Sequence, residues 1–130
     1  MEVRYLIDTN ALIDYLAELM PADGLDFMDG ILDSRDVIMS LITQIEVLGF
    51  QAPEEYLRKC QSLIAIAEVI PLVDAAIIDR VILVRRETKI KLPDAVIAAT
   101  ALIRNLTVVS RNEKDFSQVE GLKYVNPHEL

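Results

Sequence analysis

Four acidic residues carry the strongest chemical signal in this sequence: Asp8, Glu46, Asp94 and Asp115. Carboxylates gathered at one place repel one another, and some become protonated unless a cation compensates their charge. Hard divalent cations such as Mg²⁺ and Mn²⁺ prefer oxygen ligands of this kind. The four acids therefore predict a divalent-metal site if the fold brings them together.

The chemistry open to such a site is narrowed by what the sequence lacks. His128 is the only histidine, which rules out a two-histidine ribonuclease mechanism and disfavours Ser-His-Asp and Cys-His arrangements. The sequence also has no glycine-rich phosphate loop. Acid-only sites with hard metals mainly serve reactions at phosphorus, in which the ion activates water and stabilises the attacking and leaving oxygens. Metal-assisted cleavage of a phosphate ester is therefore the expected chemistry.

Short apolar stretches predict the strands that must position these acids. They cover residues 3–7, 36–39, 69–73, 106–109 and 122–125. Strands that are apolar throughout and alternate with helices indicate an α/β fold with a parallel sheet covered on both faces. Pro71 favours a peripheral position for the stretch 69–73. Sites in such folds form outside the carboxyl ends of the strands, where Asp8, Ser40 and Ser110 stand.

One predicted helix is especially informative. Apolar spacing predicts helices over residues 11–20, 25–32, 41–50, 53–68, 75–89, 92–105 and 113–119. The helix over 92–105 has Pro93 and Asp94 in its first turn, and the rest is almost wholly small or apolar. Such a helix is buried on most of its circumference. Its alanines would let it lie close to the sheet and bring Asp94 near Asp8.

Each acid also has an ordinary structural role open to it. Asp8 could only cap the following helix, and Asp94 could only complement a helix dipole. Asp115 could close a capping box that Asn112 opens. Glu46 is harder to explain as a surface residue, because apolar residues flank it. Four acids expected at one sheet edge favour the metal site over four separate structural roles.

Composition sets the broad class of the protein. Its 130 residues are 52% hydrophobic, and we expect a single domain over residues 1–130. The one cysteine, Cys60, excludes an intramolecular disulfide and a cysteine-rich metal site. The first residues resemble neither a signal peptide nor a transit peptide, and no apolar run is long enough to span a membrane. These features favour the cytoplasm.

The net charge of −8 is unevenly distributed along the chain. Residues 1–50 hold ten acidic and two basic residues, whereas residues 51–130 hold eleven of each. An acidic chain binds nucleic acid poorly through bulk charge, although metals or a local basic strip could still hold a phosphodiester. The acidic first part would also suit a basic protein partner.

Basic residues near the predicted site are candidates for contact with a nucleic-acid backbone, which is the first requirement of binding. They are Arg85, Arg86, Lys89, Arg111 and Lys114. The first three belong to the densest basic run, which leads directly into Asp94. A run of this kind is usually a solvated helix face, so a role in RNA binding and a purely structural role both stay open.

Four stretches of the sequence resemble the successive motifs of one family, the PIN domains. They are residues 6–13, 40–48, 92–101 and 108–116, in order and at typical spacing. The resemblance is strongest to VapC-type toxins of bacterial and archaeal toxin–antitoxin pairs. It implies a three-layer α/β/α sandwich with a central parallel sheet of four to five strands. It also implies an endoribonuclease that depends on Mg²⁺ or Mn²⁺ and cuts single-stranded or structured RNA.

The same resemblance assigns roles to residues and implies partners. Asp8, Glu46, Asp94 and Asp115 match the family's acidic quartet, which binds the metal and carries catalysis. Ser110 takes the place of a supporting hydroxyl residue, and Asn10 and Asn112 match supporting polar positions. A homodimer and a cognate antitoxin are implied as well. Apolar residues of the first two predicted helices could form a groove for an antitoxin helix.

Two other functions remain open at this point. The first is a non-catalytic PIN-type module that only holds a protein or RNA. The second is a phosphatase or phosphotransferase of the haloacid-dehalogenase or receiver type, which also places an Asp after the first strand. The dehalogenase pattern needs a second Asp where Asn10 stands, and the receiver pattern needs a lysine where Ser110 stands. The second alternative is therefore the weaker.

Overall fold

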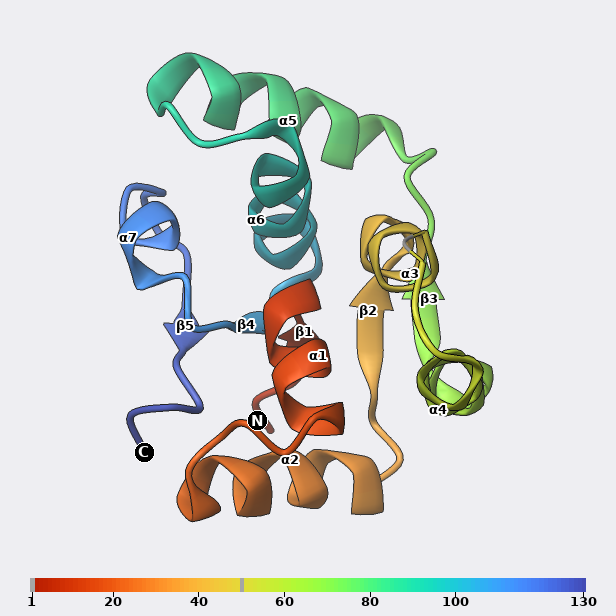
Figure 1. Cartoon of the computed structure of the whole chain (residues 1–130). Helices are drawn as coiled ribbons and strands as arrows, with labels where there is room; N and C mark the ends of the chain where they lie inside the picture. Colours follow the sequence, from red (N-terminus) through yellow and green to blue (C-terminus); the bar gives the residue numbers. More distant parts are fainter. Residues whose placement is uncertain (1, 50) are drawn as a thin grey trace.

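The computed structural model describes residues 2–49 and 51–130, and a parallel sheet lies at its centre (Figure 1). The strands are β1 (Tyr5–Ile7), β2 (Ile38–Ser40), β3 (Glu68–Ile70), β4 (Thr107–Val109) and β5 (Tyr124–Val125), in the order β3-β2-β1-β4-β5. In the register, Leu6 of β1 lies opposite Ile38 on one side and Val108 on the other. The carboxyl ends of β2, β1 and β4 are therefore neighbours.

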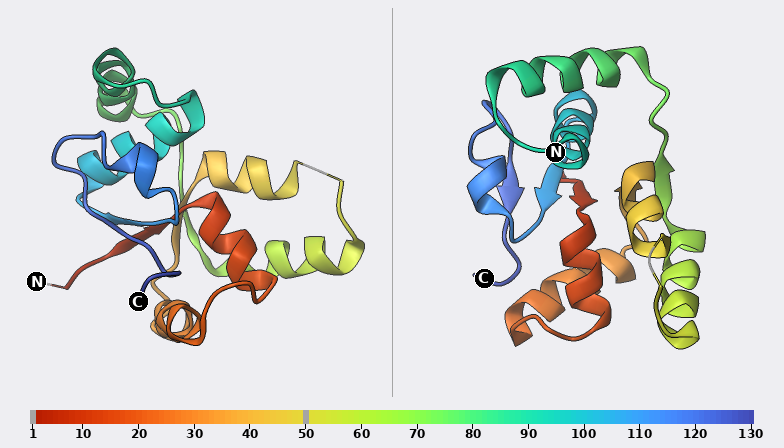
Figure 2. Two further views of the ribbon diagram at one scale, coloured as in Figure 1. Left: turned by 60° about the vertical axis from the view of Figure 1, so that its left-hand side comes forward. Right: turned by 45° about the horizontal axis from the view of Figure 1, so that its top comes forward.

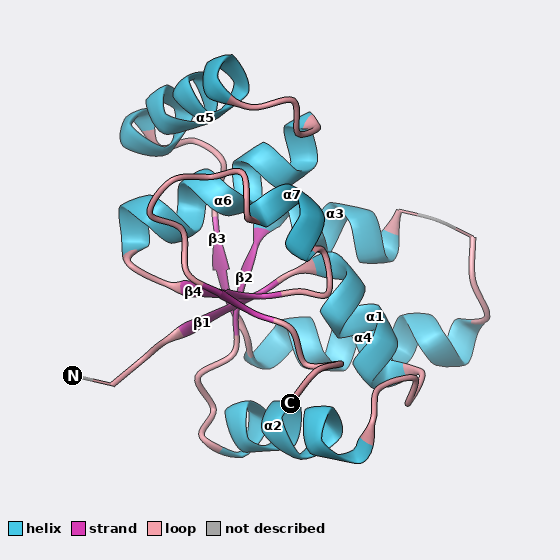
Figure 3. Cartoon of the chain, turned by 90° about the vertical axis from the view of Figure 1, so that its left-hand side faces the viewer, coloured by secondary structure: helices cyan, strands magenta, loops and turns pink. Residues whose placement is uncertain are grey.

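Helices cover both faces of this sheet. They are α1 (Thr9–Leu16), α2 (Ala22–Asp33), α3 (Leu41–Leu48), α4 (Glu54–Ile66), α5 (Ala75–Glu87), α6 (Leu92–Arg104) and α7 (Glu113–Phe116). Figure 3 shows the sheet edge-on, with α5, α6 and α7 on one side and α1, α2 and α4 on the other. The predicted three-layer α/β/α sandwich with a parallel sheet is confirmed.

Alternation along the strands divides the core in two. Leu6 and Val108 point to the face covered by α5, α6 and α7, whereas Ile7 and Val109 point to the face covered by α1, α2 and α4. All four side chains are at most 1% exposed. Because both faces are buried, the central strand β1 and the last two residues of β4 are apolar, which is the pattern that indicated a parallel sheet, whereas the edge strand β3 begins with the exposed Glu68.

The alanine-rich helix α6 lies against the sheet and beneath α5, as the views in Figure 2 show. Ala95, Ala98 and Ala99 are fully buried, so no larger side chain separates this helix from its neighbours. The helix ends where Asn105 adopts a left-handed conformation with φ of 55°. Small residues on α6 thus fix the position of Asp94 in its first turn.

We expect Ala98→Leu to destabilise the protein by about 1–3 kcal/mol, because the larger side chain must push α6 away from its neighbours. The shift would also displace Asp94, so the variant should bind metal less tightly. Urea unfolding measures the first effect, and Ala65→Leu on the exposed face of α4 is the matched control. A variant as stable and as active as the wild type would contradict this prediction.

Several predicted boundaries differ from the structure. The first helix ends at Leu16 rather than at residue 20, because Glu18 adopts a left-handed φ of 56° that ends helical geometry. The last helix is a single turn, Glu113–Phe116, instead of 113–119. β3 ends at Ile70, before Pro71, and lies at the sheet edge as predicted. The predicted end of the third helix at residue 50 lies outside the described residues.

Candidate active site

Asp8 lies at the centre of the candidate site because β1 is the central strand. It directly follows β1, only 3% of its surface is exposed, and its Oδ1 accepts a hydrogen bond from the Thr9 backbone N–H at 2.8 Å. Asp8 is therefore the N-cap of α1, which is the structural role that the sequence left open for it. The cap uses one carboxylate oxygen and leaves Oδ2 for other partners.

Asn10 and Ser110, the two residues predicted to support Asp8, both contact its Oδ2. The Ser110 hydroxyl donates at 2.8 Å and the Asn10 side-chain N–H donates at 3.0 Å. Asn10 also donates to the Ser110 hydroxyl at 2.9 Å. Ser110 and Asp8 are 102 residues apart in sequence but come from adjacent strands. Sheet pairing thus builds the support around Asp8.

The pKa of Asp8 is raised to about 6, mainly because burial disfavours its charged form. Hydrogen bonds from Ser110 and Thr9 lower this pKa, but the negative charges of Asp94 and Glu46 raise it further. Asp94 and Glu46 therefore lie close enough to Asp8 for their negative charges to raise its pKa.

Asp94 interacts with Asp115, the remaining acid of the predicted quartet. Its pKa is raised by burial first, and then by the charges of Asp115 and Glu46. The positive charge of Lys91, at the N-cap of α6, acts in the opposite direction. Charge interactions thus connect all four predicted carboxylates, which are Asp8 at the N-cap of α1, Glu46 of α3, Asp94 of α6 and Asp115 of α7.

Glu46 is held by a residue that the sequence did not single out. The Thr9 hydroxyl donates to Glu46 Oε1 at 2.7 Å and shares a second hydrogen bond, of 3.2 Å, with the buried hydroxyl of Thr43. Glu46 itself is exposed, and so is its neighbour Ile45, at 52%. The expectation that apolar flanks keep Glu46 off the surface was therefore wrong.

Asp115 combines a structural and a site position. Asn112 Oδ1 accepts from the Asp115 backbone N–H at 3.4 Å, and the Asn112 side-chain N–H donates to Asp115 Oδ2 at 3.0 Å. The Ser110 hydroxyl in turn accepts from the Asn112 backbone N–H at 3.0 Å. One chain of hydrogen bonds therefore connects Asp8 through Ser110 and Asn112 to Asp115.

The predicted substrate-binding residues occupy different settings. Arg85 donates to the Ile90 carbonyl at 3.1 Å and so braces the turn between α5 and α6. Arg111 pairs with Asp14 at 3.1 Å. Arg86, Lys89 and Lys114 are exposed. Lys91, the last residue of the basic run that leads into Asp94, is the base whose charge acts on Asp94.

The donor set fits a hard divalent cation, because it consists of carboxylate oxygens whose mutual repulsion a cation would relieve. Within residues 2–49 and 51–130, however, no group of three or more His, Cys, Asp or Glu side chains is arranged to hold a metal ion. The carboxylates are thus suitable ligands, but their side chains in the described residues do not form a complete coordination shell.

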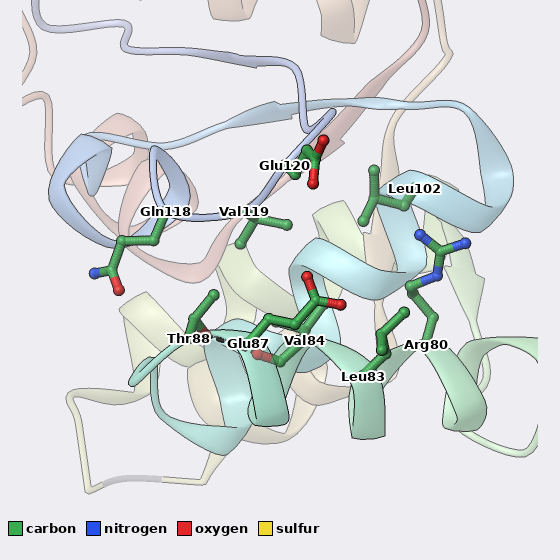
Figure 4. A pocket seen from close by; sticks show the side chains of 9 residues that line it. All are labelled: Arg80, Leu83, Val84, Glu87, Thr88, Leu102, Gln118, Val119 and Glu120. Carbon is green, nitrogen blue, oxygen red and sulfur yellow. Dashed lines mark hydrogen bonds between the residues drawn. The ribbon is translucent and has the colours of Figure 1, made fainter.

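A pocket on another side of the molecule is separate from these acids. Figure 4 shows it between α5, Leu102 of α6 and residues 118–120, with Arg80, Glu87 and Glu120 among its charged residues. None of the four carboxylates lines it.

The chain belongs to the PIN domain family, whose model matches residues 5–122. Among solved structures, it is similar to a toxin–antitoxin complex from Klebsiella pneumoniae, with 30% identity, 97% of this chain and 99% of that chain covered, and a TM-score of 0.70. The family resemblance noted in the sequence is thereby confirmed. No curated protein matches the sequence.

Two further structures show the same fold. One is FitAcB from Neisseria gonorrhoeae, with 25% identity, 97% and 99% of the two chains covered, and a TM-score of 0.78. The other is DNA-bound VapBC from Salmonella typhimurium, with 23% identity, the same coverage and a TM-score of 0.80.

None of the helices in the described part of this chain is long and apolar enough to cross a membrane.

Proposed function

We propose that this protein is an endoribonuclease that depends on Mg²⁺ or Mn²⁺ and acts as the toxin of a toxin–antitoxin pair. The observation that carries the proposal is the gathering of acids at one edge of the sheet, where Ser110 and Asn10 hold Asp8, Asn112 holds Asp115, and the charges of Glu46 and Asp94 act on Asp8. Membership of the PIN domain family supports the assignment. The similar toxin–antitoxin complex from Klebsiella pneumoniae supports the role as a toxin.

The chain's own residues would prepare the reaction as follows. Asp8 and Asp94 would be the main metal ligands, and Asp115 would complete the site. Glu46, which accepts a hydrogen bond from Thr9, would orient the attacking water and accept a proton from it. A bound divalent ion would acidify that water and stabilise charge on the phosphate oxygens. Lys91 could contact the RNA backbone beside Asp94.

The test is cleavage of single-stranded RNA and of bulk tRNA by the purified protein with Mg²⁺ or Mn²⁺. We expect cleavage that EDTA abolishes and that added ion restores. RNA binding without cleavage under any divalent ion would contradict the nuclease and favour the non-catalytic module. Hydrolysis of p-nitrophenyl phosphate without RNA cleavage would instead favour the phosphatase.

Ser110→Ala should lower the affinity for Mn²⁺ by about 10–100-fold, the usual effect of losing a partner that orients a metal ligand. Ser110 is fully buried and donates to Asp8 Oδ2, so the alanine leaves that oxygen with one side-chain donor fewer. Calorimetric titration of the metal-free protein measures the affinity. Ser34→Ala, which removes a hydroxyl donating to a backbone carbonyl of α2, is the control. Equal Mn²⁺ affinity in Ser110→Ala and wild type would contradict the role of Ser110.

A groove between α1, α2 and α4 is the proposed binding site of the antitoxin. Its apolar lining is Tyr15, Leu16, Leu32, Leu63 and Ile66. Asp26 and Asp29 are exposed on the adjoining α2, which suits a basic segment of the partner. If neither salt nor charge reversal at Asp26 and Asp29 weakens the toxin–antitoxin complex, the proposed binding of a basic segment is wrong.

The exposed face of α5 is the proposed surface of a homodimer. Ile78 and Ile82 are 47% and 46% exposed, and they line an apolar hollow together with Val81 of α5 and Val96 of α6. Ile82→Asp should weaken self-association, as measured by sedimentation velocity, whereas Leu19→Asp on another surface should not. Dimerisation of Ile82→Asp equal to that of the wild type would contradict the assignment.

A cytoplasmic location agrees with an RNA substrate and stays a prediction.

A further inference from the structure

Asp14 is a buried carboxylate for which the proposed reaction has no direct use. It lies in the second turn of α1, and only 3% of its surface is exposed. A buried carboxylate is tolerated only when cations or hydrogen-bond donors compensate it. Asp14 Oδ2 lies 3.1 Å from Arg111 Nη1 and 3.0 Å from His128 Nε2. One oxygen thus connects α1 to two segments that are distant in the sequence.

Arg111 belongs to the loop between β4 and α7, and its neighbours on either side hold the candidate ligands. Ser110 donates to Asp8, and Asn112 donates to Asp115. The Arg111 backbone N–H donates to Asn10 Oδ1 at 3.2 Å, and Asn10 also donates to the Ser110 hydroxyl, so the ion pair of Arg111 with Asp14 is a further attachment of this loop to α1. The guanidinium is half-exposed, whereas the Asp14 side chain is 4% exposed.

His128 belongs to a C-terminal turn, residues 126–129, that also reaches α7 and α2. Its backbone N–H donates to Asn126 Oδ1 at 3.0 Å, and the Asn126 side chain donates to Glu113 Oε2 at 3.3 Å. A Cβ on Gly24 of α2 would clash with the Pro127 carbonyl, so the turn lies directly on that helix. The turn is therefore held between Asp14 and the helix that carries Asp115.

We propose that Asp14 is a positioning residue that acts through Arg111 and the C-terminal turn. It fixes the loop of residues 110–112 and α7, and thereby the orientation of Asp8 and Asp115. This inference rests on the proposed nuclease function and deepens it. It assigns Arg111 to the support of the site, whereas the sequence suggested that Arg111 contacts the RNA backbone.

The test compares Asp14→Asn, Arg111→Gln and the double variant on an RNA that the wild type cleaves. We expect each single change to lower kcat about 10-fold or more, with KM within about twofold. The double variant should be no worse than either single one, because both changes break the same link. A higher KM with unchanged kcat and a shallower salt dependence would assign Arg111 to RNA and overturn the proposal.

Matched variants separate positioning from general damage. Arg104→Gln removes another arginine that pairs with an aspartate, Asp74, at 3.5 Å on a different side of the molecule, and it should leave kcat unchanged. Arg111→Lys should recover part of the lost rate. If Asp14→Asn does not fold, Arg111→Gln and His128→Gln carry the test, because each removes one partner of Asp14. Unchanged kcat in both would overturn the proposal.

Mn²⁺ affinity, measured by electron paramagnetic resonance, gives a readout that needs no cleavage. Arg111→Gln should bind Mn²⁺ more weakly than wild type and Arg104→Gln. If the wild type binds Mn²⁺ but cuts no RNA, the nuclease proposal fails while this comparison still decides the role of Asp14. Equal affinity in wild type and Arg111→Gln would count against the positioning of Asp8 and Asp115.

Discussion

Asp8→Asn is expected to lower RNA cleavage by more than about 100-fold, because loss of a metal ligand should exceed the effect of losing a supporting partner. The same change should also make the stability of the metal-free protein less dependent on pH. Burial and the charges of Asp94 and Glu46 oppose ionisation of Asp8, and an amide carries no charge to bury. Asparagine is as good an N-cap as aspartate, so α1 should keep its first turn. The variant should thus lose activity, and its stability should fall less than that of the wild type as pH rises, although its amide nitrogen cannot accept the hydrogen bonds from Ser110 and Asn10.

Asp74→Asn provides a matched control for this experiment. Asp74 is also an N-cap, because its Oδ1 accepts from the backbone N–H groups of Ala76 and Ile77 at the start of α5. This substitution should not change cleavage. Cleavage by Asp8→Asn at a rate close to that of the wild type would remove Asp8 from the proposed metal site.

The stability of the metal-free protein should fall as pH rises from about 4 to above 6. Burial raises the pKa of Asp8 from 3.8 to about 6, so the folded state binds more protons than the unfolded state within this range. Stability contributed by the protonated form is fully present below the unfolded pKa and is lost as pH rises through the folded pKa. The shift corresponds to roughly 3 kcal/mol. The raised pKa of Asp94 acts in the same direction.

Urea unfolding in EDTA between pH 4 and 7.5 measures this dependence. Asp36, whose pKa is lowered by a hydrogen bond from Arg4, works in the opposite direction, so the difference between wild type and Asp8→Asn isolates the contribution of Asp8. We expect that difference to grow with pH and to shrink when Mg²⁺ is added at pH 7.5. A difference that does not change with pH would show that Asp8 ionises normally.

The fold was predictable from the sequence because both signals on which it rests are local. Wholly apolar strands indicated a sheet buried on both faces, and the alanines of α6 indicated a helix lying close to it. Asp8 and Asp94 followed from the same local signals, because one ends a strand and the other starts a helix. The positions of these two acids therefore needed only chain direction and sheet topology.

The support of the site could not be predicted in the same way. Thr9 holds Glu46 only because α1 and α3 lie side by side, and no periodicity within either helix reveals that contact. No local pattern in the sequence connects Asp14 with His128, which lies 114 residues later and contacts it through the C-terminal turn. The apolar flanks of Glu46 misled because α3 buries little more than Thr43 and Val47. Contacts between distant segments depend on packing, which a linear pattern does not encode.

The place of β4 beside β1 bears on how the protein is made. The site joins Asp8, near the start of the chain, to Ser110 and Asp115, which the ribosome adds much later. A nascent chain that has not yet released β4 lacks one of the two neighbours of its central strand and three polar groups of the site, Ser110, Asn112 and Asp115. Translation products that stop before Asp115 would therefore carry an incomplete site. The proposed nuclease would therefore become active only when its synthesis is nearly finished.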